Sequence, residues 1–485
     1  MSALHPLPTS DRTSVLGRRV TVLGLGRREG VSLAHFLHAE GASVLVSDHQ
    51  STDKLEVSLA GIAGIPVELD LGGHDADRIL GWSDLICVSP VIPRSHPLLQ
   101  AATRRGIPLS SEVELFFERC PAPIIGITGS AGKTTVTTLL GEMLAAAGRD
   151  VRVGGNIGRP LLQELRSISA QTAVVMELSS FQLQPLRRSP HGAVVTNVTP
   201  NHLDRHADMA EYAAAKRNIV QHQCPDDWAV LNAGDPVVRG FAGSTPGATA
   251  WYSRDAPAGG GVAGAFVRNG DLVLNAGGRT RALFPMSSLM LRGTHNQENV
   301  LAACLAAALA GVPDSAMANV ATSFAGVPHR LQLVGQVGGA RCYNDSIATS
   351  PERLLAAIRS FDEPLVVIAG GRDKHLPWET AAEMLSRRAH HVVVTGEAAN
   401  RIGDAIEAAA SRTGRRPSVQ RCPTFDEAVL TAVAAARPGD VVLLSPGCAS
   451  FDQFIDFAAR GDRFAALVAA ASSVGAEQSA REEQQ

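Results

Sequence analysis

Short apolar runs alternate with amphipathic stretches along the whole chain, and most of the runs end at glycine or at a polar residue. The runs at 20–23, 124–128 and 365–371 each lead into a glycine-rich turn and then into a helical pattern. Nearly unbroken apolar runs are typical of parallel strands, because helices cover both faces of such a sheet. The pattern therefore predicts an α/β protein made of three consecutive α/β domains.

Proline and glycine mark the joints between these domains, at 121–123 and at 326–328. We expect a first domain over 1–114, a central domain over 115–326 and a last domain over 327–485. The first begins as a strand–helix–strand unit, and the glycine- and alanine-rich region 243–280 suggests a loop-rich insertion or a small antiparallel sheet. Further strands are expected at 42–48, 85–89, 108–110, 172–178, 192–197, 229–231, 391–395 and 440–445, helices at 31–39, 210–221, 297–309 and 451–459, and a disordered tail from 472.

Composition narrows the class of protein. A net charge of −3 without a lysine or arginine run argues against nucleic acid as the main partner. The seven cysteines are scattered and form no C-x-x-C pair, which is typical of reduced thiols rather than of disulfides or a zinc site. The N-terminus lacks the apolar core of a signal peptide, and the apolar runs are too short for membrane insertion. We therefore expect a cytoplasmic protein.

The segment 124–148 reads as a strand, a glycine loop and a helix, with the spacing G-x-x-G-x-x-G-K-T. Gly129 and Gly132 let backbone N–H groups approach phosphate oxygens, and the helix N-terminus adds a positive dipole. Lys133 supplies a charge for the β- and γ-phosphates, and the Thr134 hydroxyl is a ligand for Mg²⁺. The strict phosphate-loop pattern has glycine where Ile127 stands. Strand, loop, Lys-Thr pair and helix still fall in register, so the segment predicts ATP binding.

Two further segments carry candidate ligands. Glu177 ends an apolar strand and, beside the phosphate loop, would hold Mg²⁺. His202, Asp204 and His206 follow another strand, but H-x-D-x-H is short and weakly specific for zinc. Lys216 lies on the next expected helix, where an exposed lysine is the ordinary interpretation.

The first and last domains give weaker signals. The turn Gly24–Gly30 with Asp48 departs by one residue from the dinucleotide pattern, so an ordinary glycine turn explains it equally well. In the last domain, the turn at 370–374 and Ser450 before an expected helix indicate small-anion binding or ordinary capping. Cys448 has no histidine near it in sequence, which argues against a nucleophile.

Taken together and in order, these segments resemble the Mur ligase family, most closely its glutamate-adding branch, over roughly residues 17–465. The motifs that carry the resemblance are the phosphate loop, G-G-N-I-G at 154–158, E-L-S-S-F-Q at 177–182, N-V-T at 197–199, H-L-D-R at 202–205, Y-A-A-A-K at 212–216, H-N-Q-E-N at 295–299, H-R at 329–330, N-D-S at 344–346 and L-S-P-G-C-A-S-F-D-Q-F at 444–454.

The resemblance implies a Rossmann-like UDP-binding domain, a central ATPase domain and a Rossmann-like ligase domain. It also implies an ATP-dependent ligase of peptidoglycan synthesis that adds D-glutamate to UDP-N-acetylmuramoyl-L-alanine through an acyl phosphate, acting as a monomer. The residues implied for ATP are Gly129, Ser130, Ala131, Gly132, Lys133, Thr134, Thr135, Asn296, Asn299, Arg330 and Asp345. Those for the UDP substrate are Gly26, Arg27, Asp48, Ser89, Asn156, Ser179 and His202, and those for glutamate are Thr349, Lys374, Ser450 and Phe457.

The same resemblance implies two Mg²⁺ ions, with Thr134, Glu177, His202 and a carbamylated Lys216 as ligands. Lys133, Glu177, His202 and Lys216 are the implied catalytic group. A bare lysine is a poor metal ligand, whereas a carbamate is anionic, which accounts for a lysine at a metal.

Several positions depart from the family pattern. Ala131 stands where asparagine is usual in the phosphate loop, Val91 where glycine is usual, and Ile347 where many relatives carry lysine. The Ile347 change leaves open an enzyme that adds L-glutamate. Other Mur ligases and folylpolyglutamate synthetases share the ATP core, although the latter lack the UDP-binding domain. An NAD-dependent oxidoreductase would leave Lys133, Glu177 and Lys216 unexplained. A non-catalytic nucleotide-binding module would be expected to have lost Lys133 or Glu177.

Overall fold

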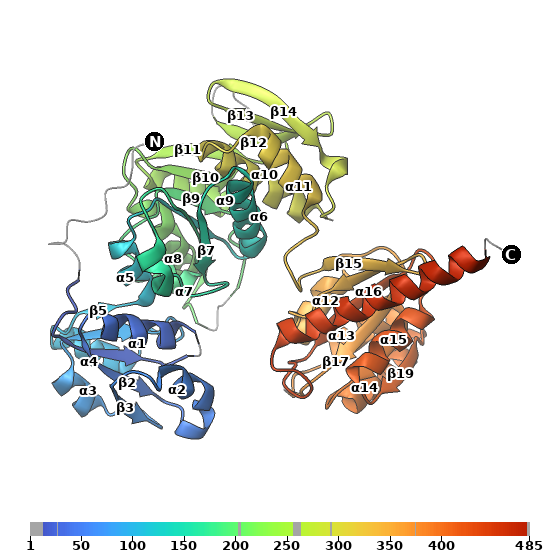
Figure 1. The fold of residues 1–485 in the computed structure, drawn as a ribbon, viewed down its shortest axis with the longest axis horizontal. Helices are drawn as coiled ribbons and strands as arrows, with labels where there is room; N and C mark the ends of the chain where they lie inside the picture. Colours follow the sequence, from blue (N-terminus) through green and yellow to red (C-terminus); the bar gives the residue numbers. More distant parts are fainter. Residues whose placement is uncertain are drawn as a thin grey trace. The chain divides into compact units, whose positions relative to one another are not determined.

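A computed structural model describes residues 13–26, 28–201, 205–255, 263–291, 293–373 and 375–482. The chain forms two compact units, Met1–Leu289 with Thr294–Phe324, and Met290–Gly293 with Ala325–Gln485. In the described part of the chain there are three sheets, of five, nine and six strands, each built mainly from parallel strands (Figure 1). The predicted α/β class is confirmed, and none of the described helices has an apolar stretch long enough to cross a bilayer.

The first sheet has the order β3-β2-β1-β4-β5 and is parallel throughout. Its strands are β1 Arg19–Leu23, β2 Ser43–Asp48, β3 Val67–Leu71, β4 Leu85–Val88 and β5 Leu109–Ser110; its helices are α1 Glu29–Ala39, η2 Thr52–Lys54, α2 Glu56–Ile62, α3 Ala76–Trp82 and α4 Pro97–Arg104. Val20 and Val22 pack with α1, whereas Leu23 packs with α3 and α4, so both faces of β1 are buried. The chain reverses its strand order between β1 and β4, which places a crevice at their carboxyl ends.

The second sheet has the order β14-β13-β12-β11-β10-β9-β6-β8-β7. Its strands are β6 Ile124–Thr128, β7 Val151–Gly155, β8 Ala173–Glu177, β9 Gly192–Val195, β10 Trp228–Asn232, β11 Ala248–Tyr252, β12 Gly264–Arg268, β13 Asp271–Ala276 and β14 Arg279–Pro285. The helices of this region are α5 Glu112–Arg119, α6 Lys133–Ala146, η3 Leu161–Ser167, α7 Ser180–Leu183, α8 Met209–Gln221, α9 Pro236–Arg239, η4 Gly240–Ser244, η5 Met286–Ser288, α10 Thr294–Leu309 and α11 Asp314–Ser323. Helices α6, α10 and α11 pack on one another, and α7 packs on α8.

The antiparallel strands expected at 243–280 are present, but they are not a separate sheet. β11 pairs in parallel with β10, and β12 pairs with β11 before the antiparallel ribbon β12–β14 begins. The ribbon extends the central sheet, so the edge of β11 is covered by hydrogen bonds instead of being left open.

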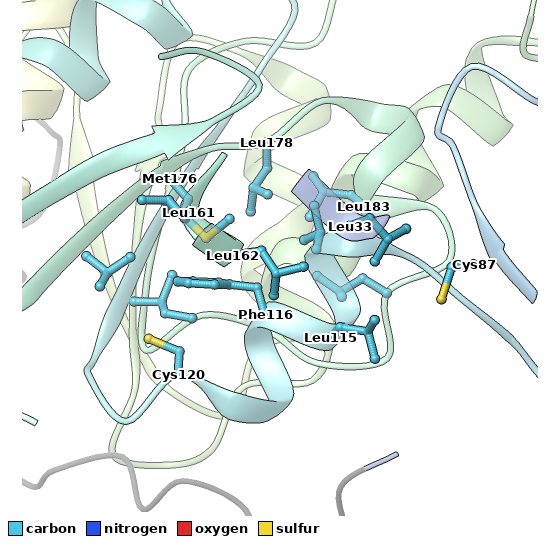
Figure 2. Packing of buried hydrophobic residues seen from close by; sticks show 14 of the residues in the cluster. Leu33, Cys87, Leu115, Phe116, Cys120, Leu161, Leu162, Met176, Leu178 and Leu183 are labelled. Atoms are coloured by element: carbon cyan, nitrogen blue, oxygen red, sulfur yellow. The ribbon is translucent and has the colours of Figure 1, made fainter. Parts of the chain in front are cut away.

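One apolar cluster joins the first and second sheets. It includes Leu33 of α1, Phe116 of α5, Leu162 of η3 and Leu183 of α7, and Figure 2 shows these side chains around a shared interior. The boundary expected between residues 114 and 115 falls inside α5, whose Leu115 and Phe116 are fully buried. The first two sheets therefore belong to one compact unit.

The third sheet has the order β15-β16-β20-β17-β18-β19, with β15 antiparallel to β16 and the other pairs parallel. Its strands are β15 Gln332–Val337, β16 Ala340–Asn344, β17 Leu365–Gly370, β18 Ala389–Thr395, β19 Ser418–Cys422 and β20 Val441–Gly447; its helices are α12 Pro351–Ile358, α13 Glu379–Arg388, α14 Ala399–Thr413, α15 Phe425–Ala435 and α16 Phe457–Glu482. Helices α12–α14 belong to one apolar cluster, and α15 and α16 to another on the opposite face (Figure 1).

Two expectations for this unit are wrong. Residues 451–456 form turns, and α16 begins only at Phe457. The Ser450 carbonyl accepts the N–H groups of Gln453 and Phe454, while Asp456 caps the helix by accepting the Ala459 N–H at 2.8 Å. The helix then continues to Glu482, where the sequence predicted a disordered tail from 472.

Candidate active site

The phosphate loop lies at the carboxyl end of β6, between β8 and β9. Gly129 and Gly132 have φ values of +151° and +82°. A Cβ on Gly129 would lie 1.8 Å from Thr196 Oγ1, and one on Gly132 would lie 2.2 Å from Asn299 Oδ1. Both positions therefore require glycine, for backbone conformation as well as for space. Helix α6 starts at Lys133, so its first N–H groups face the loop.

Asn197 and Thr196, at the end of β9, hold the loop where asparagine is missing at position 131. Asn197 Oδ1 accepts the Ala131 N–H at 2.9 Å, and its Nδ2 donates to the Ala131 carbonyl at 3.2 Å. Thr196 Oγ1 donates to the same carbonyl at 2.6 Å. The departure at Ala131 thus leaves the backbone cradle intact. Among the sequence-based expectations, Asn197 appears only as part of a family motif and Thr196 has no role, although polar residues directly after a buried strand were a usable signal.

Glu177, at the end of β8, brings together three of the expected residues. Its carboxylate is 3% exposed and accepts the Thr134 hydroxyl at 2.8 Å and the Asn156 amide at 3.0 Å. β6 and β8 are in register at Ile127 and Glu177, so the carboxylate reaches the start of α6. A carboxylate and a hydroxyl at one point are suitable ligands for Mg²⁺.

The remaining loop residues are placed as follows. Lys133 Nζ donates to the carbonyls of Gly129 at 3.1 Å and Ser130 at 3.4 Å, so the ammonium lies over the loop. Ser130 Oγ hydrogen-bonds the Thr199 carbonyl and the Tyr212 hydroxyl, each at 3.0 Å. Thr135 is buried in the first turn of α6.

Lys216 of α8 is not the exposed lysine of the ordinary interpretation. It is 1% exposed, and Nζ donates to the Gly129 carbonyl at 2.9 Å and lies 4.7 Å from the Tyr212 ring centre. Burial lowers the pKa of its ammonium to about 7. The positive charge of nearby Lys133 lowers this pKa further, whereas the negative charge of Glu177 raises it. The structure therefore places a second lysine at the phosphate loop, with a substantial neutral fraction near pH 7.

The possible zinc site is only partly described. His202 and Asp204 lie outside the described residues, and His206 is buried, stacks on Phe181 at 5.1 Å and contacts Ser180 Oγ at 3.0 Å. Within the described ranges, no group of three histidine, cysteine or acidic side chains is arranged to hold a metal. His206 is thus occupied in packing.

Residues expected on the adenine side lie at the start of α10. Asn299 is buried and donates to Asn296 Oδ1 at 3.1 Å, and the same side chain faces Gly132. The first turn of α10 therefore borders the phosphate loop.

At the UDP end, Asp48 supports a turn. Its buried carboxylate accepts the N–H groups of Leu25 at 2.7 Å and Gln50 at 2.9 Å, while Gly26 has φ +30°. Arg27 lies outside the described residues. Ser179 caps α7 with a capping box, in which its Oγ accepts the Gln182 N–H at 3.2 Å and its own N–H donates to Gln182 Oε1 at 3.0 Å.

Ser89 lines a cavity of about 460 Å³ between the first two sheets, together with Phe181, Arg205, Glu29 and Glu112. Burial raises the pKa of Glu112 to about 8, and Glu29 adds to the shift. Glu29 also accepts a hydrogen bond from Gln182 Nε2 at 3.3 Å. These two acidic residues were not predicted, because nothing local in the sequence indicates their burial.

The second unit gathers four of its expected residues at the carboxyl end of its sheet, on the segments that follow β16 and β20. Asp345 is buried, accepts the Ser445 hydroxyl at 2.8 Å and the Leu331 N–H at 3.3 Å, and has its pKa raised by burial to about 7. Arg330 opposes that shift electrostatically. Thr349 and Ser450 lie on the two segments, Phe457 opens α16, and Lys374 lies outside the described residues.

Family models match all three sheets. The Mur ligase MurD-like N-terminal domain matches residues 18–111, the Mur ligase middle domain 127–307 and the Mur ligase glutamate ligase domain 329–448. The chain therefore belongs to the Mur ligase family.

Curated relatives narrow this class. UDP-N-acetylmuramoylalanine–D-glutamate ligase of Symbiobacterium thermophilum is 45% identical over 457 residues, which cover 94% of this chain and 99% of that protein. The protein of the same name from Roseiflexus sp. is 40% identical and covers 93% of this chain and 98% of that protein. Among solved structures, the Thermotoga maritima UDP-N-acetylmuramate-alanine ligase has a TM-score of 0.54 at 18% identity, covering 92% of this chain and 98% of that one. That likeness supports the fold.

Proposed function

We propose that this protein is an ATP-dependent ligase that adds D-glutamate to UDP-N-acetylmuramoyl-L-alanine in peptidoglycan synthesis. The observation that carries the proposal is the joint placement of Lys133, the Thr134–Glu177 pair and buried Lys216 around one phosphate loop. The identity of the substrates is taken from the names of two relatives, which are 45% and 40% identical to this chain over 94% and 93% of its length.

The reaction needs an activated carboxylate, because a free carboxylate is a poor electrophile. A carboxylate oxygen of the alanine end would attack the γ-phosphorus of ATP, ADP would leave, and an acyl phosphate would result. The glutamate amine would then attack the acyl carbon, lose a proton and expel inorganic phosphate. Lys133, the loop N–H groups and the start of α6 would hold the phosphates and offset the charge that builds on the transferring group.

The hydroxyl of Thr134 and the carboxylate of Glu177, which meet at 2.8 Å, fit Mg²⁺. Thr134 and Glu177 would hold one ion at the β- and γ-phosphates, and His202 with a carbamylated Lys216 would hold a second. Bound there, Mg²⁺ neutralises phosphate charge. Carbamylation requires a neutral amine, and the lowered pKa of Lys216 supplies one near neutral pH. Glu177, fixed by Asn156, would keep its carboxylate aimed at the loop.

The substrate ends are assigned by motif. Gly26, Arg27, Asp48 and Ser89 would bind the UDP part, and Asn156, Ser179 and His202 the muramoyl-alanine part. Asn296, Asn299, Arg330 and Asp345 would bind the nucleotide, and Thr349, Lys374, Ser450 and Phe457 the glutamate carboxylates. A cytoplasmic, monomeric enzyme is part of the proposal.

The test is phosphate release from ATP with UDP-N-acetylmuramoyl-L-alanine and either D-glutamate, L-glutamate or another amino acid. Release with D-glutamate alone supports the proposal and shows that Ile347 is tolerated. Release with L-glutamate alone keeps the ligase chemistry but changes the amino acid. No release with any amino acid overturns the ligase assignment. In a folded Lys133→Ala variant, release should fall at least about a hundredfold, because the phosphates lose their counter-charge.

A further inference from the structure

Arg460, in the first turn of α16, is the most deeply buried arginine of the site-bearing edge of the third sheet. It is 2% exposed, Nε donates to Ser346 Oγ at 2.9 Å, and Nη2 donates to the carbonyls of Ser346 at 2.9 Å and Cys448 at 3.2 Å. One guanidinium therefore ties the segment after β16 to the segment after β20. A planar fork of donors is suited to such a tie, and an ammonium is not.

The contacts of Arg460 extend to residues already placed at the candidate site. Ser346 Oγ also donates to the Phe457 carbonyl at 2.7 Å, and Asn344 Nδ2 donates to the Gly461 carbonyl at 3.0 Å. The N-D-S segment that carries Asp345 is thus fixed to the first turn of α16, which carries Phe457. Cys448 precedes Ser450 by two residues, so the guanidinium holds both sides of the expected amino-acid pocket.

The charge of Arg460 is incompletely matched. Among the described residues no carboxylate lies within ion-pair distance of it; the charge of Asp452 acts on it from farther away, and Nη1 is buried without a hydrogen-bond partner. Space for Nη1 depends on Gly371, where a Cβ would lie 3.1 Å from that nitrogen and 2.2 Å from the Ala449 carbonyl oxygen. Burying a cation whose carboxylate neighbour is not in direct contact is costly, so such a group is expected where an anion binds. Burial lowers its pKa only to about 10, and it remains charged at neutral pH.

We propose that Arg460 is a positioning residue for the incoming amino acid, which fixes the segments after β16 and β20 and supplies buried positive charge beside a carboxylate-binding pocket. The inference rests on the proposed function for the identity of that amino acid. It does not place Arg460 in contact with substrate, since its nitrogens are occupied or enclosed in this structure.

The test compares Arg460→Met, Arg460→Lys and the control Arg463→Gln. Arg463 is on the same helix but is half exposed and pairs with Asp426 on the surface. Arg460→Met should raise the KM for glutamate about tenfold or more while the KM for the UDP substrate changes less than about twofold; tenfold corresponds to about 1.4 kcal/mol. The KM for glutamate of Arg460→Lys should lie between those of Arg460→Met and the parent, because lysine keeps the positive charge but lacks the planar set of donors of the guanidinium. An unchanged glutamate KM in folded Arg460→Met, or an equal rise in every KM, overturns the proposal.

A second readout does not depend on which amino acid is used. Amide hydrogen exchange in Arg460→Met should accelerate at 344–349 and 447–456 and stay unchanged in α13 and α14, with Arg463→Gln like the parent. Unchanged exchange at both segments would overturn the positioning role even for an active enzyme. If exchange is faster in Arg460→Met but the parent enzyme consumes no glutamate, the proposed function is rejected, while the role of Arg460 in holding the two segments together stands.

Discussion

Lys216 and Arg460 are buried basic side chains at the carboxyl ends of two different sheets, and burial changes their protonation to different extents. They are 1% and 2% exposed, yet burial lowers the pKa of Lys216 to about 7 and that of Arg460 only to about 10. Lys216 can relieve the cost of burial by losing its proton. Arg460 keeps its proton and is stabilised by three hydrogen bonds to Ser346 and Cys448.

The difference separates two uses of a buried cation. A lysine that is neutral near pH 7 can be modified and can change its charge, which suits a group at the phosphate loop. An arginine that stays charged has a fixed shape and a fixed charge, which suits a group that holds two segments in place. Replacing one residue type by the other is therefore the most direct test of whether the two positions need different cations.

The largest effect is expected for Lys216→Arg. Arginine remains protonated at this position and cannot be carbamylated, so turnover should fall at least about a hundredfold, as in Lys216→Ala. A small carboxylate added to the assay should partly restore Lys216→Ala, which leaves room for it, but not Lys216→Arg. Near-parental turnover of Lys216→Arg would show that proton loss at this position is unnecessary. Arg463→Lys, at the surface, is the control and should behave like the parent.

A second prediction concerns stability at alkaline pH. The usual pKa of lysine is 10.5 and that of folded Lys216 is about 7, so between these values the unfolded chain binds the extra proton. Stability should therefore rise with pH over this window, by up to about 1.4 kcal/mol per pH unit from this residue. Denaturant unfolding in CO₂-free buffer should show this slope in the parent and lose it in Lys216→Met. An identical slope in both would contradict it.

Asp345 should give the opposite slope in the neighbouring window. Burial raises the pKa of its carboxyl from 3.8 to about 7, so the folded protein binds the extra proton between these values. The contribution of Asp345 is fully present below about pH 4 and is lost as pH rises towards 7, again at up to about 1.4 kcal/mol per unit. Asp345→Asn should remove this contribution, so between about pH 4 and pH 7 the slope of the unfolding free energy against pH should become more positive than in the parent, while the alkaline side stays unchanged. A slope that is unchanged or more negative in the variant would contradict the assignment.

The sequence predicted the phosphate loop well because its parts are contiguous. Lys133 and Thr134 follow the glycines directly, and backbone geometry alone places them at the loop. Glu177 required in addition that β8 lie beside β6, an adjacency that the sequence-based prediction assumed and that apolar runs alone do not indicate. The burial of Lys216 depends on how α8 packs, with Tyr212 against its ammonium, and no local pattern contains that information.

The second unit was harder to predict for the same reason. Ser450 with Gln453 three residues later resembles the start of a helix, yet Gln453 accepts the Phe425 N–H instead, and Asp456 is the cap. Arg460 is one of several arginines on helices, and only the fold places it between two loops. In both cases the outcome depends on contacts between segments that are distant in sequence, so hydrophobic periodicity could not predict it.

The smallest effect is expected for Ser346→Ala, which tests the tie without removing a charge. The change leaves the Phe457 carbonyl and Arg460 Nε without the partner that both share. Because an unsatisfied buried group costs about 1–3 kcal/mol, the second unit should lose stability in that range. Ser360→Ala, whose hydroxyl lies just after α12 and donates to the Ala356 carbonyl of that helix, should stay within about 0.5 kcal/mol. Two equal losses would mean that the Ser346 bridge adds nothing beyond a local hydrogen bond, and Arg460 would then hold the two segments through backbone carbonyls alone.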